Sequence, residues 1–107
     1  MKKLFALAAI AAAAVAAHAQ DFPGGKPVTI VVPFAAGGRV DIIARMVGEH
    51  LQKKLGATVV IENMGGAGGN IGVNRVAKAQ PDGYTIGLAS TSPLAIAPSL
   101  YGSKLQF

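Results

Sequence analysis

The chain has 107 residues, with ten lysines and arginines against five acidic residues, and it contains no cysteine. This length allows one domain at most, and the lack of cysteine excludes a disulfide framework. The basic residues are scattered, without a basic stripe carrying interleaved aromatics, which argues against a nucleic-acid partner.

The first nineteen residues have the pattern of a secretory signal peptide. A basic start at residues 1–3 precedes an uncharged run, Leu4–Ala17, and Ala17-His18-Ala19 forms a cleavage site. The run is too short to span a bilayer, so we prefer a cleaved signal to a membrane anchor. Cleavage after Ala19 would take nineteen residues from 107 and leave 88, as residues 20–107.

Behind the signal, strand and helix patterns alternate. The predicted elements, in chain order, are a strand at 28–32, a helix at 41–55, a strand at 58–61, a helix at 71–79, a strand at 84–89 and an apolar segment from 93 to 101 that could be helical. In the first helix, Ile43, Val47 and Leu51 recur every four residues, with Met46 and Leu55 beside them, which predicts its apolar face. The order predicts an α/β fold, a parallel sheet with flanking helices.

Two glycine-rich turns follow the first two strands and have the form of anion-binding loops. They occupy residues 33–41 and 62–70, and each leads into a predicted helix. Free backbone N–H groups at a helix N-terminus favour a negatively charged ligand without any catalytic side chain. Ligands gather beyond the carboxyl ends of strands in open α/β sheets, so the polar loop at 90–93 is expected at the same edge.

Two side-chain groups near these loops allow more than one interpretation. Asp41 can cap the helix that it begins, and it stands four residues before Arg45. The pair either only fixes the loop and helix or, by fixing them, presents the amides of residues 35–39 to a ligand carboxylate. The hydroxyls of residues 90–92 either donate to an anion or belong to an ordinary strand-to-helix turn.

A nucleotide-dependent oxidoreductase is the alternative to a binding protein. Glu62 occupies the place of a ribose-binding acid, but Ile71 stands where the last glycine of a dinucleotide motif should be. His50 is the only histidine left after processing, and no metal-ligand spacing or Ser/His/Asp set is present. We therefore expect no catalytic residue, metal or cofactor. A small interaction module that docks on a membrane partner is a third alternative.

Three motifs occur in order along the processed chain. They read Val-Val-Pro-Phe-x-x-Gly-Gly-x-x-Asp-Ile-Ile-Ala-Arg at 31–45, Val-x-Glu-Asn-x-x-Gly-Ala-Gly-Gly-Asn-Ile-Gly at 60–72 and Ala-Lys-Ala-x-Pro-Asp-Gly-Tyr-Thr at 77–85. Together they resemble the signatures of the Bug/TctC family, the periplasmic solute-binding receptors of tripartite tricarboxylate transporters. The likeness extends from about Lys26 to Tyr101, nearly all of the processed chain.

The resemblance implies part of a two-lobed Venus-flytrap receptor without enzymatic activity. Such a receptor closes around a small carboxylate or related polar solute and delivers it to a membrane permease, or serves as a sensor. The resemblance implies loop-bracing roles for Asp41 and Arg45, and ligand binding by backbone amides and hydroxyls. The ligand-binding residues that it nominates are Phe34, Ala35, Ala36, Gly37, Gly38, Gly66, Ala67, Gly68, Gly69, Asn70, Ser90, Thr91 and Ser92.

The chain departs from the family pattern in two respects. Arg39-Val40 replaces a pair that is more often small or hydroxylated, and Arg39 could contact an anion or point into solvent. The family is also several times longer, which implies that residues 20–107 are an N-terminal part of the first lobe. We expect the full-length form to be a monomer, and the isolated chain, with half a cleft, to bind weakly or not at all.

Overall fold

The computed structural model describes residues 21–105 and 107, and the predicted signal peptide lies outside them. The helices and strands are β1 (Val28–Val32), α2 (Arg39–Leu55), β2 (Val59–Asn63), α3 (Asn70–Ala77), β3 (Thr85–Gly87) and α4 (Ala97–Tyr101). Short helical turns precede α3, at Ala67–Gly69, and flank α4, at Ser92–Ile96 and Gly102–Lys104. Within residues 21–105, none of the helices has the length and hydropathy to cross a membrane.

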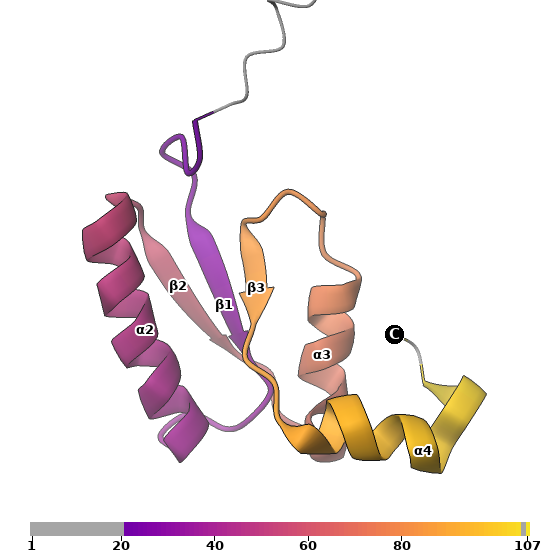
Figure 1. Cartoon of the computed structure of the whole chain (residues 1–107). Coiled ribbons are helices and arrows are strands. Elements are labelled where there is room, and N and C mark those ends of the chain that lie inside the picture. Colours follow the sequence, from indigo (N-terminus) through magenta and orange to yellow (C-terminus); the bar gives the residue numbers. More distant parts are fainter. Residues whose placement is uncertain (1–20, 106) are drawn as a thin grey trace, which may run out of the picture.

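Three parallel strands form the sheet in the order β2-β1-β3, with β1 in the centre. Val28 pairs with Val59 and Val32 with Asn63, so the carboxyl ends of β1 and β2 are level. The helix α2 contacts β1 and β2, whereas α3 contacts β1 and β3, and the two helices lie on opposite sides of the sheet (Figure 1). This arrangement confirms the predicted α/β fold and parallel sheet.

The central strand β1 forms the middle of the core. Its residues are apolar apart from Thr29, and Ile30, Val31 and Val32 are almost completely buried. Ile30 and Val32 pack against Ala44 of α2. Helices cover both faces of β1, as is usual for the central strand of a parallel sheet.

The apolar face predicted for the first helix is confirmed only at its C-terminal end, where Leu51 packs against the core and Leu55 is half-buried. Ile43, Met46 and Val47 are exposed, while the buried positions of α2 include Ala44 and Gly48. A Cβ added at Gly48 would lie 3.3 Å from side-chain atoms of both Ile61 and Val59, so the small residues let the helix approach the sheet closely. The periodicity of large apolar residues therefore does not by itself identify the face of α2 that packs on the sheet.

Element ends also differ from the prediction. The helix α2 begins two residues before Asp41, so this residue lies in the first turn and does not begin the helix. The strand β2 extends to Asn63 because Glu62 and Asn63 continue the pairing with the end of β1. The third strand is shorter than predicted. Leu88 still donates to the Val31 carbonyl at 3.0 Å, and beyond it the chain turns toward the helical segment.

A cluster of side chains holds the segment before β1 against the turn before β3. The rings of Phe22 and Tyr84 lie 5.0 Å apart, and the Tyr84 hydroxyl donates to the Pro23 carbonyl at 2.9 Å. The Lys26 ammonium lies 4.5 Å from the centre of the Tyr84 ring and 3.3 Å from an Asp82 oxygen. This cluster sits at the amino edge of the sheet and leaves the carboxyl edge open.

Candidate functional site: the carboxyl edge of the sheet

Three loops meet at the carboxyl edge of the sheet, at the lower end of the strands in Figure 1. They follow β1 (residues 33–38), β2 (residues 64–69) and β3 (residues 88–91). A Cβ added at Gly65 would lie 3.3 Å from the Ala35 nitrogen, and one at Gly68 would lie 3.5 Å from the Ser92 hydroxyl oxygen. The second loop therefore packs against the first loop on one side and against the helical turn that follows the third loop on the other.

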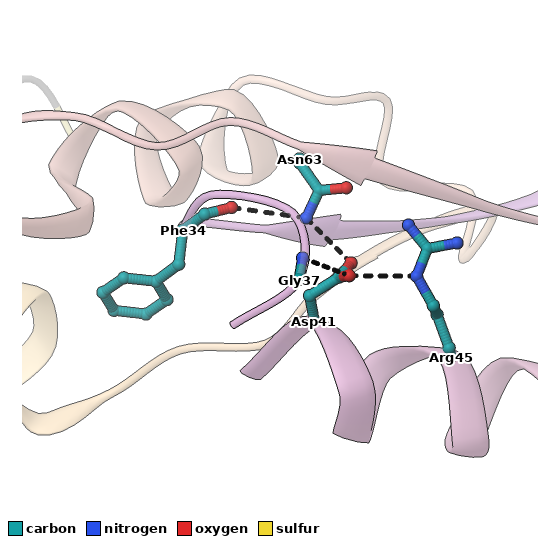
Figure 2. Close-up of polar contacts among 5 residues, drawn as sticks. All are labelled: Phe34, Gly37, Asp41, Arg45 and Asn63. Atoms are coloured by element: carbon teal, nitrogen blue, oxygen red, sulfur yellow. Dashed lines mark hydrogen bonds and ion pairs between the residues drawn. The ribbon is translucent and has the colours of Figure 1, made fainter. Parts of the chain in front are cut away.

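Asp41 lies at the centre of the hydrogen bonds that hold the first loop (Figure 2). Its Oδ2 accepts from the Gly37 amide at 2.8 Å and from Arg45 Nε at 3.0 Å. Its Oδ1 accepts from Asn63 Nδ2 at 2.9 Å. The Asp41 side chain is only 3% exposed, whereas that of Arg45 is 55% exposed. Both carboxylate oxygens thus act inside the protein, and the loop backbone is tied to the first turn of α2.

These bonds lower the pKa of Asp41 to about 2, with the bond from Arg45 the largest cause, followed by those from Gly37 and Asn63. Asp82 also has a lowered pKa, chiefly because it accepts a bond from the Tyr84 amide. In the unfolded chain, both aspartates have the ordinary aspartate pKa, which is near 3.9. The folded state therefore gains stability from both carboxylates above that pH.

We expect this stability to be lost as the pH falls from about 4 toward 2, because the folded state then binds fewer protons than the unfolded state. Urea unfolding midpoints between pH 5 and pH 2.5 measure the loss. The variants Asp41→Asn and Asp82→Asn should each flatten the pH dependence. An unchanged dependence in Asp41→Asn would show that this carboxylate titrates normally in the folded protein.

Asn63 is a central residue of this site, although the sequence analysis did not predict it as a site residue. Besides its bond to Asp41, its Nδ2 donates to the Phe34 carbonyl at 3.3 Å (Figure 2). The parallel register places Asn63 beside Val32, immediately before the first loop, and so brings its side chain within reach. The available signal was an amide residue at the end of a strand that begins with three apolar residues.

The second loop has an unusual backbone conformation. The four residues Gly66–Gly69 all have positive φ, between 48° and 124°. Ala67 is the one residue among them with a side chain, and such residues adopt positive φ at an energetic cost. The loop can follow this path because its other three residues are glycine.

Both loops present backbone N–H groups that have no acceptor in the described part of the chain. The helix α2 has Gly38 as its N-cap, which provides no side-chain acceptor for the first turn. Among residues 21–105, the loop amides without an acceptor include those of Ala35, Ala36, Gly65, Gly66, Ala67 and Gly68. These positions are exposed. An edge rich in donors and poor in acceptors favours an anion over a cation.

The other predicted residues are placed at the same edge with fewer contacts. Gly69 is buried, and a Cβ there would lie 3.7 Å from the Phe34 ring, so these two residues link the loops from inside. Asn70 is the first residue of α3 and is half-buried. Ser90 is half-buried and Thr91 is exposed, and neither side chain forms a hydrogen bond within residues 21–105.

The residues considered for enzymatic chemistry, Glu62 and His50, belong to different elements, β2 and α2. Glu62 forms an ion pair of 3.6 Å with Arg75, and both side chains are partly exposed. His50 is exposed on α2. The residues that the structure describes contain no group of three or more histidines and acids that could hold a metal ion.

Residues 43–107 match the family described as the tripartite tricarboxylate transporter family receptor, TctC. The chain belongs to this family. It is 45% identical over 97 residues to the protein BugT of Bordetella pertussis, an alignment that covers 88% of this chain and 29% of BugT. The resemblance seen in the three motifs is therefore confirmed.

Part of the fold of two solved bacterial proteins is similar to this chain. MatC of Rhodopseudomonas palustris, solved with bound malate, is 43% identical, with a TM-score of 0.69 over 76% of this chain and 27% of MatC. A second R. palustris protein, solved with adipate, is 40% identical, with a TM-score of 0.63 over 67% of this chain and 24% of that protein. The chain spans 20% to 29% of the length of the relatives that it matches.

Proposed function

We propose that the chain is the N-terminal part of the first lobe of a periplasmic solute-binding receptor, exported by a signal peptide at residues 1–19. In this proposal it has no enzymatic activity and binds a small carboxylate, which the whole receptor delivers to a permease of the tripartite tricarboxylate type. Membership of the TctC family supports this function, as do the malate and adipate bound to similar structures.

The observation that carries the proposal is the set of unpaired loop amides at one edge of the sheet. A carboxylate at this edge accepts from exposed loop amides that have no acceptor of their own, at residues 35, 36 and 66–68, and the Ser92 hydroxyl lies beside the second loop. The Asp41 carboxylate does not accept from these free amides, because its oxygens already accept from Gly37, Arg45 and Asn63. In this proposal, Asp41 and Arg45 brace the loop that the ligand contacts.

Two glycines provide a matched test. Gly37 and Gly56 have φ of +83° and +63°, and a Cβ added at either would meet no atom within 4 Å. Alanine at either position should therefore cost about 1 kcal/mol of stability through backbone strain alone. Only Gly37→Ala alters the first loop, and we expect it to weaken malate binding about tenfold, because bonds from amides to a charged group are lost.

Malate titration of the isotope-labelled chain, followed by amide NMR shifts, measures this effect even when binding is weak. Shifts should concentrate in residues 34–38, 66–70 and 90–92, and the neutral diamide of malate should not produce them. Equal malate affinity in Gly37→Ala, Gly56→Ala and the unaltered chain would place the ligand elsewhere. Equal shifts with the diamide would exclude an anion site.

A further inference from the structure

Arg39 stands directly at the edge of the candidate site. It is the first residue of α2, it follows Gly38, and its side chain is exposed. The N–H groups of the first turn carry the positive end of the helix dipole. A cation at this end is disfavoured in the free protein, because like charges meet there. An anion bound at the loop would remove this conflict.

Within the residues that the structure describes, no acidic side chain forms an ion pair with Arg39. All five acidic residues lie within the described residues 21–105, where the ion pairs engage Lys26, Arg45 and Arg75. Asp41 is the nearest acid in sequence, but its carboxylate is nearly buried and its oxygens are occupied. The Arg39 guanidinium therefore adds positive charge to an edge that already offers amide donors.

We propose that Arg39 determines specificity by binding a second anionic group of the solute, so that this chain prefers dianionic to monoanionic carboxylates. This inference rests on the proposed function, in which the first carboxylate binds the loop amides. A guanidinium can bind a carboxylate through two parallel hydrogen bonds, which a neutral end of the solute cannot accept in the same way.

Succinate and butyrate test the proposal, since both have four carbons and only succinate has a second carboxylate. Amide shifts of the full chain are followed with each acid, for the unaltered protein and for Arg39→Gln, Arg39→Lys and Lys53→Gln. Lys53 is the matched control, because it is exposed in the last turn of α2, at the opposite end of the helix. Its replacement changes the net charge by the same amount.

We expect Arg39→Gln to weaken succinate binding about fivefold, as for an exposed ion pair, and to change butyrate binding less than about twofold. Arg39→Lys should retain part of the preference, and Lys53→Gln all of it. An unchanged ratio of succinate to butyrate affinity in Arg39→Gln would overturn the role of Arg39 and leave the proposed function intact. So would an equal loss in Lys53→Gln, since net charge would then explain the preference.

The two proposals fail in different ways. If neither acid shifts the amides of residues 34–38 and 66–70, the carboxylate site itself is wrong, and the role of Arg39 falls with it. If both acids shift these amides equally in the unaltered chain, the site is supported and the preference for dianions is refuted.

Discussion

Gly72→Ala is expected to lower the free energy of unfolding by about 3 kcal/mol, the upper end of the usual cost of overpacking. A Cβ at Gly72 would lie 2.7 Å from both Cα and Cβ of Pro33 and 3.0 Å from the Met64 carbonyl oxygen. These atoms belong to the backbone and to a rigid ring, so they cannot move without displacing the first or second loop. Urea or thermal unfolding measures the loss.

Gly48→Ala is the control for this prediction. Gly48 also lies within a helix that packs on the sheet, but its added Cβ would meet the ends of the Ile61 and Val59 side chains, at 3.3 Å. Alanine also favours a helix over glycine by about 1 kcal/mol, which offsets the crowding. We expect Gly48→Ala to change stability by less than about 1 kcal/mol. Equal losses in the two variants would show that helix–sheet spacing, and not contact with Pro33, limits both positions.

Asp41→Asn is expected to reduce the folding equilibrium constant about ten- to a hundredfold, because bonds to a buried charged group are lost. Asparagine has nearly the same shape as aspartate. Its NH2 group, however, must replace one of the two Asp41 carboxylate oxygens, and both of these accept hydrogen bonds. One oxygen faces Gly37 N–H and Arg45, and the other faces Asn63 Nδ2. Either orientation of the amide therefore places a donor against a donor. The loop amides should lose their native NMR shifts in the same variant.

Arg45→Met separates the surface ion pair from the bonds inside the protein. The Arg45 side chain is largely exposed, so its loss should change the folding constant less than about fivefold. Asn63→Ala should fall between the two, since it removes a bond to Asp41 and one to the Phe34 carbonyl. If Arg45→Met proved as damaging as Asp41→Asn, the ion pair would be the main support of the loop.

The fold could be predicted because its main signals are local. The apolar run of β1 and the alternation of strands and helices indicated a parallel sheet, and the rule for ligand sites in such sheets placed three loops at one edge. The packing face of α2 could not be predicted in the same way. Ala44 and Gly48 face the sheet because they are small, and small residues add little to a hydrophobic pattern.

The role of Asn63 was hidden for a different reason. Its partners Asp41 and Phe34 lie 22 and 29 residues away, and only the register of β1 against β2 brings them together. Glycine within a helix, as at Gly72, ordinarily weakens it. In the structure Gly72 also permits a contact with Pro33, which depends on tertiary packing. Neither the hydrogen bonds of Asn63 nor the contact between Gly72 and Pro33 can be predicted from residue spacing along the chain.

The bonds of Asn63 also couple ligand affinity to the assembly of the sheet. The first loop is bonded at Phe34 and Asp41 to a side chain that belongs to β2, so its arrangement depends on β2 being paired with β1. Any ligand that requires the ordered loop therefore stabilises the β1–β2 pairing by the same free energy by which that pairing improves its affinity. A change that loosens β2 far from the loops must weaken binding, although it removes no contact to the ligand.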